Sequence, residues 1–431
     1  MRFPNMSDLD RDQRNVYVNA PSDGAILVVG PPGTGKTVMA FHRAHKLKGL
    51  GQDPKVIMFS SVLRDFSSER SGVAPGVPVS TMHGWTKAWW KKGGMGQLPM
   101  IGDSPFLFDW EAMMERVLDL KAGDQRIAKL DWGHLLIDEG QDFPETMYFA
   151  LGKVMRHLGK LGVPLRLTVF ADDNQRLQID NNCSVASIAN NLRITADTQR
   201  NYLLQRNYRN SREVAKFARY FQVGRASGAA LPPDRAGEMP SVLFFANDRE
   251  LADLVVRKAK MSPGKQVGIL VHGTSSKVKR AFNQVQLRAK EAGIKVQYYL
   301  NKDKQNLPPL DFEAEGTITV LHEMSAKGLE FDLVFYAGLE GIDTSQTGGL
   351  NEKMAMYVMA SRARGELVLC FNDIDLGEPP PPGLSLMPPP VRDLCRFDVA
   401  TSGAPPLEPF LSKVSWREPP ADSPYWEHDA S

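Results

Sequence analysis

The sequence is most constrained by the run Gly30-Pro-Pro-Gly-Thr-Gly-Lys-Thr37, which directly follows the apolar stretch Ala25–Val29. The run fits the pattern G-x-x-x-x-G-K-[ST] of a phosphate-binding loop between a buried strand and a helix. Its glycines let successive N–H groups converge on phosphate oxygens, and the positive end of the following helix points at the same anion. The pattern predicts an α/β domain that binds a nucleotide.

The polar residues in and near this loop have distinct expected roles. Lys36 reaches the β- and γ-phosphates, and Thr37 offers its hydroxyl to Mg²⁺. Gln13 precedes the loop, where its amide is suited to the adenine edge because it both donates and accepts; a plain surface glutamine is the alternative. Asp10 is expected to cap a short helix there. The predicted nucleotide-binding residues are Gln13, Gly30, Gly33, Thr34, Gly35, Lys36 and Thr37.

A second pattern, His134-Leu-Leu-Ile-Asp-Glu-Gly-Gln-Asp142, is an apolar strand that ends in two adjacent acids. Beside a phosphate loop, such a strand end supplies a carboxylate for Mg²⁺ and a base for water. We expect Asp138 to hold the metal and Glu139 to deprotonate the attacking water. Gln175 follows another predicted strand, where an amide can bond the γ-phosphate or the water.

Four residues in the first 100 positions are candidates for contact with nucleic acid. Ser60 ends the predicted strand Lys55–Ser61, and the carboxyl ends of parallel strands are where ligands of α/β sheets bind. Thr81, His83 and Trp85 offer polar groups and a ring that can stack on a base. A Trp85 packed in the core is the alternative, because tryptophan is so often buried.

A second α/β unit is predicted after residue 200. Its expected strands are 239–245, 266–272, 295–300, 316–321, 333–336 and 366–370, with helices at 248–259, 277–293 and 351–363 and a loop at 322–332. Ahead of it, Tyr208 is a candidate stacking ring and Arg209 a candidate arginine finger. Taken alone, the run Arg206–Arg209 is more typical of a basic exposed surface.

The 431 residues are 42% hydrophobic with a net charge of +2, so any nucleic acid would bind a local groove rather than a globally basic surface. Three distant cysteines lack metal-ligand spacing, and the first residues form no apolar leader, which together favour the cytoplasm. From residue 376 the chain is rich in proline, which predicts an extended or disordered tail. Its aromatic residues Phe397, Phe410, Trp416 and Trp426 could hold it against the core or against a protein partner. The predicted domains are 1–200, with a small insertion at about 87–132, then 201–375, and the tail 376–431.

The ordered series of motifs is similar to that of UvrD/Rep-type superfamily-one helicases, over residues 9 to 370. Besides the runs above, the series contains Thr-Met-His-Gly-Trp85, Ala-Asp-Asp-Asn-Gln175, Asn-Tyr-Arg-Asn210, Ser-Ala-Lys-Gly-Leu-Glu-Phe-Asp332 and Tyr-Val-Met-Ala-Ser-Arg-Ala-Arg364. The resemblance implies two RecA-like domains with parallel sheets, ATP in the cleft between them and single-stranded nucleic acid across their top.

The same resemblance implies roles for individual residues. Tyr208 stacks on the adenine, Glu330 meets the ribose or phosphate side, and Gln175 senses the γ-phosphate. Arg209 and Arg362 act as arginine fingers from the second domain. The resemblance further implies ATP and Mg²⁺ as cofactors and movement from 3′ to 5′ along a strand, with a role in DNA repair or phage defence.

The chain departs from the family pattern at three points that concern nucleic acid: Ala171 replaces a usual glycine, Arg176–Ile179 replaces frequent base-stacking aromatics, and Met324 replaces a frequent histidine. The distance from Asn207 to Gly316 also leaves no room for the family's large accessory domain. A DNA-dependent ATPase of helicase type is therefore the main hypothesis. An RNA-directed motor and an ATP-gated switch that regulates a partner such as a nuclease stay open as alternatives.

Overall fold

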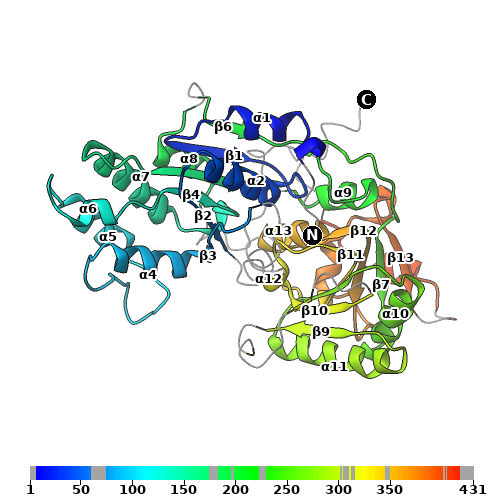
Figure 1. The fold of residues 1–431 in the computed structure, drawn as a ribbon. Helices are drawn as coiled ribbons and strands as arrows, with labels where there is room; N and C mark the ends of the chain where they lie inside the picture. The colour runs from blue at the N-terminus through cyan, green and yellow to red at the C-terminus, as the bar shows by residue number, and fades with distance from the viewer. Residues whose placement is uncertain are drawn as a thin grey trace. The chain divides into compact units, whose positions relative to one another are not determined.

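The computed structural model describes residues 6–59, 74–173, 183–195, 199–222, 230–300, 303, 310–311, 316–344, 350–400, 403 and 405–417. The chain forms two compact units that meet in sequence at Gln205 and Arg206, five residues beyond the predicted boundary. Figure 1 shows the first unit in blue to green and most of the second in green to red. Among the described residues, no helix combines the length and the apolar character needed to cross a membrane.

The first unit is built on a six-stranded sheet in which all strand pairs are parallel. Its strand order is β3-β2-β4-β5-β1-β6. The central strands are almost continuously apolar, as expected for parallel strands that are covered on both faces. The strands are β1 (Ala25–Val29), β2 (Pro54–Met58), β3 (Val79–Thr81), β4 (His134–Ile137), β5 (Arg166–Ala171) and β6 (Asn201–Leu203).

Helices cover both faces of this sheet. Helix α2 packs against β2, β4 and β5 on one face. On the other face, Leu27 and Val29 of β1 join the core formed with α4, α5, α7 and α8. The helices of the unit are α1 (Arg11–Asn19), α2 (Lys36–Gly49), α4 (Met82–Lys92), α5 (Trp110–Leu118), α6 (Arg126–Lys129), α7 (Glu145–Lys160) and α8 (Val185–Leu192), with short 3-10 turns at Met6–Asp8 and Gly140–Asp142.

The predicted insertion at about 87–132 is helical and has a core rich in tryptophan. Trp89 and Trp90 are buried on α4. The indole of Trp85 stacks on that of Trp89 at 5.4 Å between ring centroids, and Trp132 packs edge-on against both. Helix α5 begins after Asp109, whose side chain accepts a hydrogen bond from the Ala112 amide at 2.9 Å.

The second unit contains a seven-stranded sheet, also parallel throughout, with the order β13-β7-β12-β11-β8-β10-β9. Helices α10 and α11 share one apolar core with the sheet, and α9 and α13 pack against β12. The elements are α9 (Arg212–Arg219), β7 (Ser241–Phe244), α10 (Asp248–Met261), β8 (Val267–Val271), α11 (Ser275–Glu291), β9 (Val296–Tyr299), β10 (Ile318–His322), α12 (Glu323–Ala326), β11 (Phe331–Ala337), α13 (Leu350–Ala360), β12 (Ala363–Phe371), β13 (Arg396–Val399) and α14 (Glu408–Leu411), with 3-10 turns at Leu339–Gly341, Pro382–Leu386 and Pro390–Arg392.

The expectation of an extended or disordered tail is wrong for its described residues. Strand β13 pairs with β7 and so adds an edge to the second sheet. The ring of Phe410 packs edge-on against that of Phe244 at 5.4 Å, and Phe397 packs in the same way against Trp416 at 5.7 Å. The high proline content did not predict this structure. The prolines form short turns, and the apolar side chains between them are buried in the core. Residues 418–431 lie outside the described part of the chain.

Two α/β units with parallel sheets confirm the predicted fold class. Most predicted strands and helices are present within a few residues of their expected bounds. Several further elements fall in segments for which no regular structure was expected. They include the helices α4, α7 and α8, with 11, 16 and 8 residues, and the short elements β3, β6 and α12, with three or four residues each.

Candidate nucleotide-binding site

The phosphate-binding loop runs from the end of β1 to the first residue of α2. Gly33 and Gly35 have φ angles of 81° and 86°, which side-chain-bearing residues rarely adopt. A Cβ atom at Gly30 would lie 2.7 Å from the Thr34 hydroxyl oxygen, and one at Gly35 would lie 2.9 Å from the Gln13 amide nitrogen. The loop therefore needs glycine for its backbone angles at two positions and for space at Gly30 and Gly35.

Lys36, the first residue of α2, folds back over the loop. Its Nζ donates to the carbonyl oxygens of Gly30 at 2.6 Å and Pro31 at 3.3 Å, and it lies 3.9 Å from Asp172 Oδ2. The ammonium is therefore held across the mouth of the loop by groups that a phosphate could replace. Asp172 is a site residue that the sequence analysis missed, although it belongs to the Ala-Asp-Asp run named there.

Thr37 and Asp138 come together from α2 and the end of β4. The Thr37 hydroxyl donates to Asp138 Oδ2 at 2.7 Å. Asp138 is fully buried, and its other oxygen, Oδ1, has no hydrogen-bond partner among the described residues. Burial, with the neighbouring Glu139 charge, raises the pKa of Asp138 to about 7 against the opposing effects of Thr37 and Lys36.

This pair of residues fits a divalent cation. A buried carboxylate oxygen without a partner is costly, and a bound cation satisfies it while favouring the ionised carboxylate. A hydroxyl and a carboxylate are also the oxygen ligands that Mg²⁺ prefers, with substrate phosphates supplying further oxygens. Among the described residues, no group of three or more His, Cys, Asp or Glu side chains could hold a metal ion with protein ligands alone.

Glu139 is held in place by Gln141, a second residue that the sequence analysis missed. Gln141 Nε2 donates to Glu139 Oε2 at 2.7 Å, and Gln141 Oε1 accepts from the Asp172 amide at 3.0 Å. Glu139 itself has a φ of 53°, an unusual conformation for a residue with a side chain. Gln141 thus links the ends of β4 and β5, and its position in the Asp-Glu-Gly-Gln-Asp run is the signal that could have found it.

Gln13 reaches the same loop from α1. Asp10 caps this helix as predicted, in a capping box in which Gln13 Oε1 accepts from the Asp10 amide at 3.2 Å. Gln13 Nε2 donates to the Thr34 carbonyl at 3.1 Å. Both ends of the Gln13 amide are therefore bonded within the chain, and contact with adenine stays a prediction.

The candidates for nucleic-acid contact have mixed positions. Thr81 caps α4 by accepting a hydrogen bond from the Gly84 amide at 3.3 Å. Trp85 is only 5% exposed, so a base could stack on it only if neighbouring rings moved, and its packing matches the core alternative. His83 is partly exposed and bonds the Phe106 carbonyl. Ser60 and Gln175 lie outside the described residues.

In the second unit, Glu330 joins two arginines. Its Oε2 accepts from Arg209 Nε and its Oε1 from Arg364 Nη2, both at 2.7 Å, while Arg364 Nη1 also bonds Asp332 at 3.2 Å. Burial would raise the pKa of Glu330, but the two arginines outweigh it and lower the pKa to about 2. Arg364 was not among the predicted site residues.

Arg362 and Tyr208, also predicted site residues of this unit, differ sharply in exposure. Arg362 is 1% exposed, and its guanidinium donates to the carbonyl of Val358 and the hydroxyl of Ser361, both at 2.9 Å. Tyr208 is half exposed, and the guanidinium of Arg206 lies over its ring at 5.7 Å from the centroid. Tyr208 therefore offers exposed ring surface, whereas Arg362 is bonded to its own unit.

No protein-family model and no curated protein sequence matches this chain. Among solved structures, it is similar to the helicase MrfA, a DUF1998 helicase bound to DNA and AMPPNP, with 9% identity over 85% of this chain and 48% of that one and a TM-score of 0.45. It is also similar to T. fusca Cas3 with ATP, with 13% identity over 89% of this chain and 49% of that one and a TM-score of 0.39.

A third similar structure is the C-terminal domain of a possible DNA helicase from Lactobacillus plantarum WCFS1, with 20% identity over 44% of this chain and 98% of that one and a TM-score of 0.30. The chain spans about half the length of MrfA and of Cas3. What the chain does therefore has to follow from its own residues.

Proposed function

We propose that this protein hydrolyses ATP with Mg²⁺ and couples hydrolysis to movement on single-stranded nucleic acid. The observation that carries the proposal is the arrangement around Asp138. One of its oxygens accepts a hydrogen bond from the Thr37 hydroxyl of the phosphate loop, and the other is buried with no partner in the part of the chain that the structure describes. A Mg²⁺ ion bound with ATP would satisfy that oxygen.

The hydrolysis step follows from the residues around this pair. The loop amides and Lys36 would bind the phosphates, and Thr37 and Asp138 would hold Mg²⁺, which neutralises phosphate charge when bound. Glu139 takes a proton from water, the water oxygen bonds to the γ-phosphorus, and the bond from that phosphorus to the ADP oxygen breaks. Gln141 keeps Glu139 oriented through its 2.7 Å hydrogen bond.

Arg209 is the better of the two proposed arginine fingers. Its Nε is anchored on Glu330, while its two terminal nitrogens have no partner among the described residues. A guanidinium fixed in this way can give two parallel bonds to a phosphate. Arg362, by contrast, would have to leave two hydrogen bonds of 2.9 Å to reach a ligand.

The finer assignment rests on the ordered motifs. We infer a UvrD/Rep-type motor of two RecA-like domains that acts on DNA from 3′ to 5′ and serves DNA repair or phage defence in the cytoplasm. On this assignment Gln13 and Tyr208 hold the adenine and Gln175 senses the γ-phosphate.

Steady-state ATP hydrolysis, with and without single-stranded DNA or RNA, tests the proposal. We expect strong stimulation by one of the two nucleic acids and loss of turnover in Glu139→Gln, which keeps the shape of the side chain but cannot take the proton. Glu145→Gln, at the first position of α7 and outside the site, is the matched control and should hydrolyse normally. A slow rate that neither nucleic acid changes would contradict the motor and favour the ATP-gated switch.

A further inference from the structure

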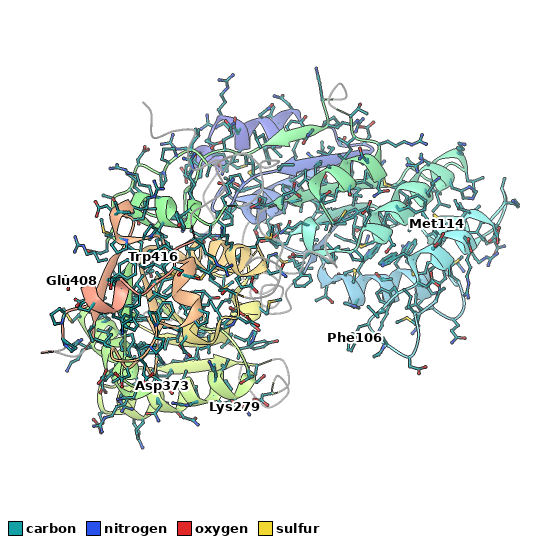
Figure 2. All side chains as sticks on the ribbon, turned by 180° about the vertical axis from the view of Figure 1, so that it is seen from behind. Phe106, Met114, Lys279, Asp373, Glu408 and Trp416 are labelled. Carbon is teal, nitrogen blue, oxygen red and sulfur yellow. The ribbon has the colours of Figure 1, made fainter. Side chains whose placement is uncertain are left out.

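A narrow hairpin at residues 100–108 carries exposed apolar side chains and contacts the predicted nucleic-acid segment through His83. Met100 and Phe108 form an antiparallel bridge, and the Ile101 amide donates to the Leu107 carbonyl at 2.8 Å. Beyond this bridge, Ile101, Phe106 and Leu107 are 56%, 65% and 55% exposed. Figure 2 shows Phe106 at the periphery of the first unit. The hairpin is therefore pinned at its base and presents apolar side chains to solvent.

The hairpin is also attached to α4. His83 Nε2 and the Phe106 carbonyl oxygen lie at hydrogen-bond distance, 2.8 Å apart. The His83 ring packs against the rings of Phe106 and Phe108, with centroids 5.7 and 5.2 Å away. Because Phe108 is buried and His83 belongs to a regular helix, the exposed Phe106 ring is held by a rigid support rather than by a free loop.

Two lysines follow His83 along α4. His83, Lys87 and Lys91 are spaced by four residues and so share one face of the helix. Lys87 and Lys91 are exposed and have no ion-pair partner among the described residues. The sequence of α4 contains no acidic residue. A phosphate backbone that follows this face would therefore meet cations without competing carboxylates on the same helix.

We infer that the hairpin and α4 form a contact site for single-stranded nucleic acid, in which a base stacks on Phe106 and phosphates lie along Lys87 and Lys91. An aromatic ring next to a cationic track is the combination with which proteins bind single strands independently of sequence. The site deepens the proposed function, since it supplies a stacking ring for a chain whose residues 176–179 lack aromatics.

Binding of a fluorescent oligo(dT) to the full chain without nucleotide tests the site. We expect Phe106→Ala to bind roughly 5- to 150-fold more weakly, the affinity change that stacking one base is worth. Phe106→Trp should retain affinity, and its added indole emission should be quenched by the strand. Phe149→Ala is the matched control, because Phe149 is a 40% exposed phenylalanine on α7 of the same unit. An abasic strand should bind the wild type and Phe106→Ala equally.

The lysines are tested by salt dependence. Lys87→Ala and Lys91→Ala should each lower the slope of log affinity against log salt by about 0.7, the value for one phosphate of a single strand. Wild-type affinity in Phe106→Ala would overturn the stacking site. A change in the oligomeric state of Phe106→Ala, with unchanged strand binding, would instead make the hairpin a protein interface. A wild type that binds no single strand would contradict the proposed function as well, which separates the two failures.

Discussion

Replacement of Arg362 separates a structural arginine from a catalytic one. In Arg362→Ala, the Val358 carbonyl and the Ser361 hydroxyl lose a charged donor at 2.9 Å, inside a unit where the side chain is 1% exposed. A hydrogen bond to a charged group contributes about 1.5–3 kcal/mol, so the two together are worth at least about 3 kcal/mol. The weaker contact to the Leu329 carbonyl, at 3.4 Å, adds little.

This loss is a large fraction of the free energy of unfolding of a typical domain, about 5–15 kcal/mol. For a unit of about 200 residues, a loss of about 3 kcal/mol lowers the melting temperature by roughly 6–12 °C. Arg209→Ala should act mainly on turnover. It removes one charged hydrogen bond, from Nε to Glu330, instead of two, so we expect about half the loss of stability but turnover that is about a thousandfold slower.

Thermal unfolding followed by circular dichroism, together with ATP hydrolysis at a temperature where every variant is folded, measures both effects. Arg362→Lys keeps the charge but not the fork of donors, so its melting temperature should lie between those of the wild type and Arg362→Ala. The reasoning is refuted if Arg362→Ala melts like the wild type and turns over a thousandfold more slowly, since Arg362 would then be the finger that the motif series implies.

Two further predictions concern the first unit. Gly140→Ala should destabilise it by about 1–3 kcal/mol, because a Cβ there would lie 2.4 Å from Val169 Cγ1 and 2.9 Å from the Tyr148 hydroxyl. Gly159→Ala on α7 is the control, because a Cβ there has nothing within 4 Å. Equal urea midpoints for the two variants would contradict the packing argument. Acid should destabilise the unit through His134, because burial, with Arg43 and Arg166, lowers its pKa to about 3. The unfolded chain therefore takes up a proton near pH 6.5 that the folded chain refuses, so stability falls as the pH drops from about 6.5 towards 3, by about 2 kcal/mol at pH 5. Urea unfolding at pH 7.5 and at pH 5 measures this difference in the free energy of unfolding. His45→Gln, at an exposed histidine, is the control and should lose as much stability at pH 5 as the wild type. An equally large loss in His134→Gln would exclude His134 as the source of the pH dependence.

The amino-acid sequence determined the local chemistry of the phosphate loop and the class of the fold. Gly33, Gly35 and Lys36 have their roles because of backbone angles and chain spacing over eight residues, and these depend little on distant packing. The apolar strands alternating with helices likewise allow few arrangements besides parallel sheets. This is why Asp10, β1 and most of the second sheet could be predicted without coordinates.

Only the tertiary structure decided which side chains are paired and which are buried. The sequence analysis missed three site residues whose partners lie at least 31 positions away in the chain: Gln141, Asp172 and Arg364. The spacing of residues in the sequence does not reveal such contacts. The same is true of Trp85, which sequence leaves open as a base-stacking ring and packing makes a core residue.

The proline-rich segment shows the limit most clearly. Its composition is typical of an extended chain. In the structure, however, β13 pairs with the edge of β7, and the ring of Phe410 packs against that of Phe244. Composition reports what a segment can do alone, whereas burial depends on the surfaces that the rest of the fold offers to it. Part of the free energy that orders this segment therefore comes from residues more than 150 positions earlier in the chain.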